Sequence, residues 1–176
     1  MSLSKQNFAR ASEETINVQV NAELAASQTY LSIAAWCGRD SVALPGFKKY
    51  FLHAAEEERE HAQLLIDYQN KRGGKVRLEA IPAPEAEWRS AQNVLETALQ
   101  LEKDVNQSLL KLQALGDENN DPQLCDFIES HFLSEQVDAI SELSHYVTKL
   151  NRVGGDGLGL YMLDQEIGSA VDAKKN

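Results

Sequence analysis

The sequence predicts an all-α fold, a four-helix bundle with one long crossover loop between its second and third helices and a short fifth helix. Four long segments repeat apolar residues at the helical period, and almost nothing alternates at the period of a strand. Two connections between these segments are short, whereas the middle one is long. A chain of 176 residues suits a single domain, 1–176, large enough to bury a substantial core.

The first two predicted helices cover about residues 8–38 and 44–72. Only a few residues around Asp40 join them, which forces the two helices to be antiparallel neighbours. The apolar face of the first helix carries Ile16, Val20, Ser27 and Ala34, with Leu24 and Leu31 beside it. The face of the second carries Leu44, Phe47, Phe51 and Ala54, then two polar residues, then Leu65 and Tyr68.

The next two predicted helices cover about residues 90–115 and 122–153, and five residues join them. Asp121 suits the cap of the fourth helix because Pro122 is favoured at a first helical position. Gly154 ends that helix, a short fifth helix follows at about 158–167, and residues 171–176 are expected to be a frayed tail. The apolar faces carry Leu95, Ala98, Val105, Leu109 and Leu112 on the third helix, and Ile128, Phe132, Ala139, Leu143, Tyr146 and Leu150 on the fourth.

The connection over residues 73–88 is too long for a bundle turn. A helix of about 28 residues is about 42 Å long, and roughly 16 extended residues reach about 50 Å. The loop can therefore run the length of the bundle and make the second and third helices parallel. A disordered linker between two hairpins is the other interpretation. Val76, Leu78, Ile81 and Trp88 favour the crossover, since they would pack on the bundle.

Composition excludes several classes of function. The net charge of −10 disfavours nucleic acid and anionic membrane surfaces as partners and favours a small cationic one. No apolar run approaches the roughly 18 residues of a membrane span, and the first seven residues contain no apolar signal segment. Cys37 and Cys125 form no metal-binding CxxC pattern and are too few for a disulfide scaffold. A reduced, cytoplasmic setting is expected.

The informative feature is a set of polar residues that interrupts the apolar faces of all four long helices near mid-length. They are Glu23 and Tyr30 on the first helix, Glu58 and His61 on the second, Glu102 on the third and Gln136 on the fourth. Each has an ordinary explanation by itself, as a solvated edge residue or a hydrogen-bonded core residue. Three ionised carboxylates in one interior would cost many kcal/mol, so either they are protonated or a cation lies among them.

Carboxylates with one imidazole suit Fe(II) or Mn(II), and no thiolate is placed to favour zinc. Di-metal bundles take one Glu from each of two helices and Glu-x-x-His from each of the other two. Here the fourth helix offers only Gln136-x-x-Ala139. One metal position would therefore have Glu23, Glu58 and His61, and the other Glu102 with the shared Glu58 and a weak donor in Gln136. Such a site should hold its second iron loosely, which suits iron as a substrate that passes through.

Two other classes of function stay open on the residues alone. A dedicated di-iron oxidase acting on an organic substrate would need firmly held iron, which the missing Glu-x-x-His on the fourth helix disfavours. A non-enzymatic helical signalling bundle is opposed by the ligand set and by the absence of a signal segment.

Seven stretches resemble animal ferritins of the heavy-chain, catalytic type, and the similarity extends over essentially the whole chain. They are YLS (30–32), KYFLH (49–53), EEREHA (57–62), QNKRGG (69–74), LEK (101–103), VNQSLL (105–110) and NDPQLCDFIE (120–129). The resemblance implies a ferritin-like bundle that self-assembles into a hollow cage of twenty-four subunits. It also implies oxidation of Fe(II) by O2 at a centre holding two iron ions per subunit, with storage of ferric mineral inside.

The resemblance also assigns roles to individual positions. The ferroxidase ligands would be Glu23, Glu58, His61 and Glu102, with Glu58 bridging, beside the second-site Gln136 and the neighbouring Tyr30. Glu57 matches a carboxylate of iron transit to the cavity, and Asp126 and Glu129 match the acidic ring of the three-fold entry channels. For Asp126 and Glu129 the ordinary alternative is a favourable place in a first helical turn.

Two departures from the family pattern bear on the cavity and the pores. Gln63 stands beside Glu57 and Glu60 where a third mineral-nucleating glutamate is common, which predicts weaker nucleation inside the shell. Glu166, on the fifth helix, stands where mammalian heavy chains carry a histidine at the four-fold contacts.

Overall fold

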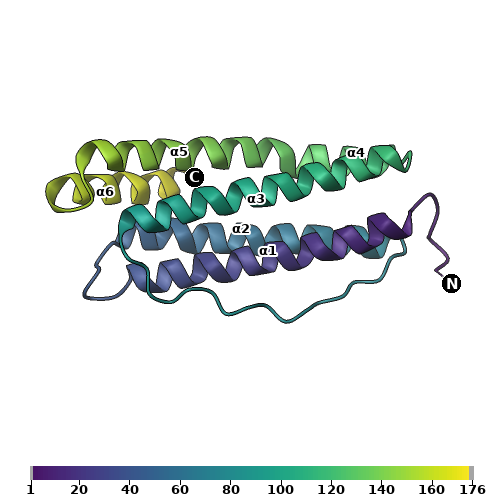
Figure 1. Cartoon of the computed structure of the whole chain (residues 1–176), viewed down its shortest axis with the longest axis horizontal. Helices are drawn as coiled ribbons and strands as arrows, with labels where there is room; N and C mark the ends of the chain where they lie inside the picture. The colour runs from purple at the N-terminus through teal and green to yellow at the C-terminus, as the bar shows by residue number, and fades with distance from the viewer. Residues whose placement is uncertain (1, 175–176) are drawn as a thin grey trace.

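A computed structural model describes residues 2–174 and contains helices and no strand over that range. The long helices are α1 (Arg10–Cys37), α2 (Pro45–Lys71) and α3 (Ala91–Glu118), followed by α4 (Pro122–Ile128), the π-helix η1 (Glu129–Leu133), α5 (Ser134–Val153) and α6 (Gly157–Lys174). Helices α1 and α2 pack along their length, and α3 runs beside the α4–α5 arm (Figure 1). The predicted four-helix bundle with an additional C-terminal helix is confirmed.

The crossover lies on the bundle and follows α1 from end to end (Figure 1). Two asparagines of α1 hold its backbone. Asn17 accepts the Arg77 N–H at 2.7 Å and donates to the Lys75 carbonyl at 2.9 Å, and Asn21 accepts the Glu79 N–H at 2.8 Å. These bonds satisfy the backbone of a segment that has no secondary structure of its own.

Apolar anchoring of the crossover is uneven. Trp88 is buried, Val76 and Ile81 are half-buried, and Leu78 is 65% exposed. The expectation that Leu78 packs on the bundle is therefore wrong. The placement of Leu31 beside the inner face of the first helix is also wrong, since Leu31 is half exposed. Hydrogen bonds from Asn17 and Asn21 of α1 hold this part of the crossover on the bundle in place of the apolar contact expected from Leu78.

The predicted cap of the fourth helix is confirmed, because the Asp121 side chain accepts the Leu124 N–H at 3.1 Å ahead of Pro122. The expected continuous helix over 122–153 is interrupted, however, by η1. A π turn takes one more residue than an α turn, so it rotates the preceding segment by about 100°. Phe127, on α4 before η1, is buried, and its ring stacks on Tyr68 with centroids 4.0 Å apart.

The C-terminal helix is longer than expected. It runs to Lys174 instead of about 167, so the frayed tail expected from 171 is wrong as far as 174, and residues 175–176 lie outside the described range. Ile167 and Val171 are buried, and Asp164 accepts the Phe47 N–H at 2.9 Å. This contact caps the first turn of α2 from another helix, because Leu44 provides no side-chain cap.

Candidate metal centre

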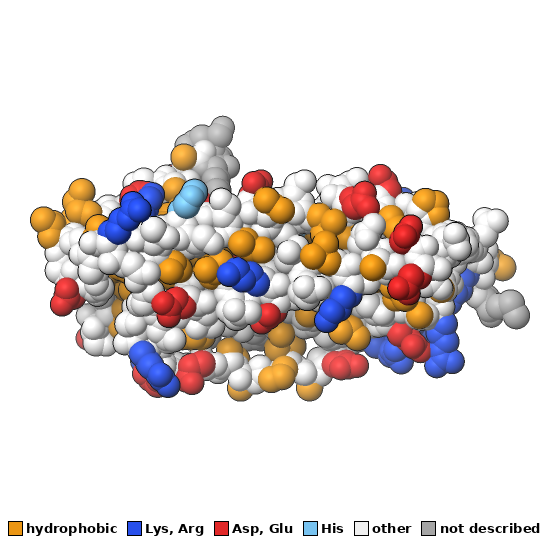
Figure 2. All heavy atoms as spheres, turned by 45° about the horizontal axis from the view of Figure 1, so that its top comes forward, with side chains coloured by type: hydrophobic (Ala, Val, Ile, Leu, Met, Phe, Trp, Pro, Cys, Tyr) orange, Lys and Arg blue, Asp and Glu red, His pale blue; other side chains and the backbone are white. Residues whose placement is uncertain are grey.

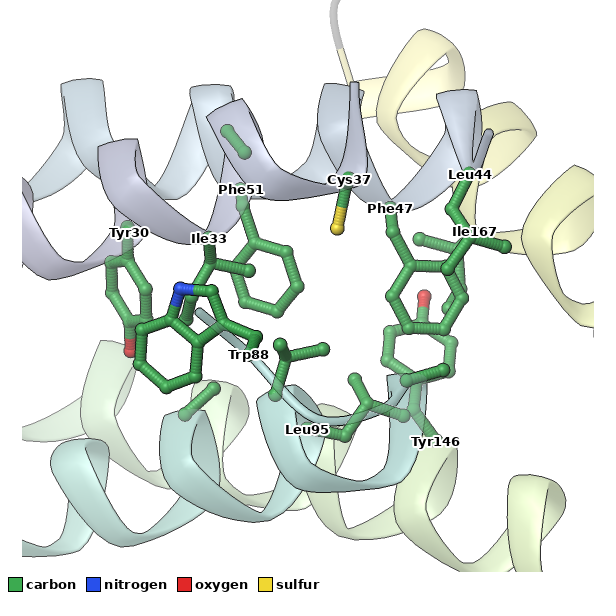
Figure 3. Close-up of a cluster of buried hydrophobic side chains, with 14 of the residues drawn as sticks. Tyr30, Ile33, Cys37, Leu44, Phe47, Phe51, Trp88, Leu95, Tyr146 and Ile167 are labelled. Carbon is green, nitrogen blue, oxygen red and sulfur yellow. The ribbon is translucent and has the colours of Figure 1, made fainter. Parts of the chain in front are cut away.

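The buried apolar side chains form two clusters, one toward each end of the bundle, and the partly buried Leu101 packs against both. Figure 3 shows the cluster that includes Phe51, Leu95 and Ile167, with Tyr30 at its edge. The second cluster contains Val20, Leu65, Val105 and Phe132, among others. Four buried polar residues, one from each arm of the bundle, fall in sequence between the members of the two clusters, and they are Glu23, Glu58, Glu102 and Gln136. The sequence prediction of inward polar residues near mid-length is therefore correct in its geometry.

The three carboxylates are almost completely removed from solvent. The exposed fractions are 0% for Glu23, 4% for Glu58 and 5% for Glu102. No lysine or arginine is paired with any of them among the described residues. Buried charges without a partner are strongly unfavourable, so this interior needs either protons or a cation.

Glu23, Glu58 and His61 converge on one point. One potential ligand atom from each lies within 4.8 Å of the other two. Glu23 comes from α1, whereas Glu58 and His61 lie on one face of α2 because residues three apart on a helix are neighbours. Oε2 of Glu23 is buried and receives no N–H or hydroxyl hydrogen bond, although Glu23 interacts directly with the carboxyl group of Glu58. An orphaned carboxylate oxygen beside a second carboxylate and an imidazole is the donor set that a divalent transition metal fits.

Glu102 and Gln136 form the adjoining half of the centre. The Tyr30 hydroxyl donates a hydrogen bond to Glu102, and Gln136 Nε2 donates to Oε2 of Glu102 at 3.1 Å and to its carbonyl at 3.0 Å. Glu58 also interacts directly with Glu102, so Glu58 stands between the two halves. The sharing of Glu58 between two metal positions stays a prediction. Gln136 turns its amide nitrogen toward Glu102 and acts there as a donor.

Burial dominates the electrostatics of these groups. It raises the pKa of Glu58 to about 8, with the nearby charge of Glu102 as the second cause. Burial raises the pKa of Glu23 well above its usual value too, and the charge of Glu58 adds to this effect. The pKa of the Tyr30 hydroxyl is likewise raised, first by burial and then by Glu102. The centre without a metal therefore holds protons where a cation would replace them.

A cavity of about 440 Å³ between α2 and α5 leads to the centre, and Tyr30, Glu58, His61, Glu102 and Gln136 line it. Its rim is acidic and carries Glu57, Glu135, Asp138 and Glu142. Glu57, the expected transit residue, is exposed and thus lies between the buried carboxylates and solvent.

Glu135 is a part of the site that the sequence did not reveal. Its Oε2 lies 2.8 Å from Nε2 of His61, while Nδ1 of His61 lies 3.3 Å from Glu58. A carboxylate on the outer nitrogen fixes the ring orientation and the tautomer of a metal-binding histidine. No signal in the chain could identify it, because Glu135 has an exposed side chain outside the apolar stripe of α5.

Comparison with known proteins identifies the family of this chain. Residues 13–153 match the Ferritin family, described as a ferritin-like domain. The chain belongs to the ferritin family. It is also 53% identical over 167 residues to soma ferritin of Lymnaea stagnalis, a match that covers 94% of this chain and 95% of that protein. Ferritins bind and store iron and assemble into cages, and the oxygen-rich interior of this ferritin suits that ion.

The two acidic residues expected at the entry channels of the ferritin cage lie away from the centre. Asp126 is on α4 and Glu129 opens η1, and both are exposed. Glu129 accepts a hydrogen bond from Gln113 Nε2 at 2.9 Å, and Ser130 Oγ lies 3.4 Å from Asp126. Neither lies in the first turn of α4, so the helix-dipole explanation of their acidity does not apply to that helix.

The two departures from the ferritin pattern both lie on the surface. Gln63 is exposed and donates to Asp67 at 2.9 Å. Glu166 of α6 forms an ion pair with Lys149 of α5. No helix among residues 2–174 of this ferritin is long and apolar enough to cross a membrane.

Proposed function

We propose that this ferritin oxidises Fe(II) with O2 at the buried centre and deposits the ferric product inside a cage of twenty-four subunits. Two Fe(II) ions are the substrate, and O2 takes one electron from each, which with two protons gives two Fe(III) and one hydrogen peroxide. Iron storage follows from membership of the family, and ferroxidase activity is the finer step proposed for this chain. The relation to soma ferritin supports storage without specifying catalysis.

The observation that carries the proposal is the orphaned Oε2 of Glu23 beside Glu58 and His61. Glu23, Glu58 and His61 would bind the first Fe(II). Glu102 and the bridging Glu58 would bind the second, with Gln136 as its weak neighbour. Tyr30 holds Glu102 by its hydroxyl and could supply a transient electron. Geometry and electrostatics set by the protein, and redox chemistry at the metals, would together produce the reaction.

The same proposal gives roles to the residues outside the centre. Glu57 would pass iron from the centre to the cavity, and Asp126 and Glu129 of three subunits would converge at the entry channels. Six carboxylates at one pore would raise the local concentration of cations. We also propose a cytoplasmic location, which the two free cysteines support.

The test is stopped-flow absorbance after mixing the assembled protein with Fe(II) in aerated solution. Glu58→Ala with His61→Ala should slow the rapid oxidation by about 100-fold or more, because it removes the bridge and the imidazole together. The cage should remain assembled. Glu56→Ala with His145→Ala is the matched control, since it removes the same residue types at exposed positions and should leave the rate unchanged. Unchanged fast oxidation in the first variant would reject the proposed site.

A further inference from the structure

Gln19 is a completely buried glutamine on α1 that has no place in the proposed chemistry. It lies one helical turn before Glu23, and its exposed fraction is 0%. Its amide nitrogen donates to Oε1 of Glu23 at 2.8 Å, whereas its own Oε1 is buried and has no hydrogen-bond partner. A buried polar side chain with one oriented bond and one orphaned atom calls for an explanation.

The bond from Gln19 makes the two oxygens of Glu23 different. Oε1 receives the amide N–H, whereas Oε2 receives no N–H or hydroxyl and belongs to a carboxylate that interacts with Glu58. Rotation of the carboxylate about its last bond would exchange the two oxygens, and the amide restrains that rotation. Glu23 is thus held with one oxygen unoccupied beside Glu58 and His61, whose ligand atoms lie within 4.8 Å of it.

We propose that Gln19 is a positioning residue that fixes the carboxylate of Glu23 so that Oε2 is free to bind the divalent cation. The inference rests on the proposed function of the centre. An amide suits this role because it donates to a carboxylate without carrying a positive charge. A lysine or arginine at this position would neutralise the charge that attracts the cation.

Packing alone does not explain a glutamine here. Methionine has nearly the same length and volume and would remove the unpaired amide oxygen of Gln19, although Oε1 of Glu23 would then lose its donor. These two effects on stability oppose each other, so removal of the amide should change the stability of the fold little while it weakens the binding of the cation. A residue that merely supports the fold would show the opposite pair of effects.

The experiment is an anaerobic titration of the assembled protein with Co(II), whose visible absorption reports the ligand geometry. In Gln19→Met the affinity for the first Co(II) should fall about 10-fold, the usual effect of losing a hydrogen bond to a metal ligand, and the spectrum should change. The thermal midpoint should change little. Gln69→Met is the matched control, because Gln69 is also completely buried but donates to the Glu13 carbonyl at 2.7 Å, outside the centre.

The outcomes separate this inference from the proposed function. If Gln19→Met binds Co(II) with unchanged affinity and spectrum while Glu58→Ala does not bind it, the positioning role is overturned and the centre stands. If the parent protein binds no Co(II) at all, both are overturned. Gln19→Leu is the second variant should Gln19→Met fail to assemble, and the same loss of affinity is expected from it.

Discussion

Three buried carboxylates that are paired with no lysine or arginine over residues 2–174 define this molecule at the scale of single residues. The cost of burying Glu23, Glu58 and Glu102 appears as raised pKa values for the first two, with burial as the first cause. A protein that needed these positions only for stability would have apolar residues there, since well-packed hydrophobic side chains commonly serve as well or better. The arrangement is understandable as a site that exchanges protons for metal ions.

Cation binding should accordingly release protons from Glu58. Its pKa is raised from 4.5 to about 8, so at about pH 7 the group is mostly protonated, and a bound cation displaces the proton. At about pH 9 the group is already ionised, and the release should fall. Since the folded chain keeps a proton that the unfolded chain loses, the metal-free protein should also lose stability as the pH rises from 4.5 to about 8.

An indicator dye in weakly buffered, anaerobic solution measures this release as Co(II) is added. Glu56→Gln is the control, because it removes an exposed carboxylate outside the centre and should leave the pH-dependent release unchanged. Proton release that is the same at about pH 7 and about pH 9 would contradict the assignment.

The half of the centre around Glu102 and Gln136 should bind its metal ion more firmly when ligands are added to α5. Gln136→Glu with Ala139→His gives α5 the Glu-x-x-His pattern that firmly bound di-metal bundles use. Metal analysis after dialysis should then find two retained divalent ions per subunit, where the parent protein loses the second. Val137→Glu with Ile140→His places the same pair one residue further along, with Val137 at a 65% exposed position, and should retain no additional ion.

Residues of the centre differ in how well the sequence reveals them. Glu23, Glu58, Glu102 and Gln136 could be found because each interrupts an apolar stripe at helical spacing. Gln19 could not, although it lies in the core, because an isolated glutamine carries no pattern that separates it from an edge residue. Only the fold shows that its amide contacts a ligand oxygen.

At the scale of elements, the spacing of apolar residues predicts which helices form and in what order. It does not predict where a helix is interrupted or which helices dock on one another. The sequence does not predict the π-helix η1, because one additional residue in a turn leaves the apolar helical pattern before and after that turn intact. The extension of α6 was missed because its apolar residues, such as Ile167 and Val171, acquire meaning only once α2 is beside them. Asn17 and Asn21 accept hydrogen bonds from the backbone of the crossover, and the sequence alone does not show that these residues meet.

The docking of α6 on α2 should depend on Gly46. A Cβ at this position would lie 1.8 Å from the Asp164 carbonyl oxygen, and a Cβ on Gly168 of α6 would lie 3.1 Å from the Cα of Gly46. Gly46→Ala should therefore displace α6, break the bond from the Phe47 N–H to Asp164, and cost about 1–3 kcal/mol.

Hydrogen exchange followed by mass spectrometry checks this prediction through the Phe47 amide, which should exchange faster in the variant. Gly155→Ala is the control, because a Cβ there meets no atom within 4 Å. Exchange at Phe47 that is unchanged by Gly46→Ala would show that α6 does not depend on this close approach.

At the scale of the whole molecule, the surface indicates that the chain has further contacts. Acidic, basic and apolar side chains are interspersed on the face in Figure 2, and apolar ones gather at the end formed by α6. Leu158, Tyr161 and Met162 there are each more than half exposed. Exposed apolar residues grouped in this way mark protein interfaces, which agrees with the cage assembly of ferritins.

Native mass spectrometry should therefore find a particle of several hundred kilodaltons. Leu158→Asp with Tyr161→Asp should reduce its population, since charge would be buried at the contacts made by α6. A parent protein that is monomeric or dimeric under the same conditions would contradict the proposed cage.

The most direct measurement is anomalous X-ray diffraction at the iron edge from crystals soaked anaerobically in ferrous salt. Iron should appear among Glu23, Glu58 and His61, with a second, weaker peak beside Glu102. An interior without iron, whose carboxylates have turned toward solvent, would contradict the account.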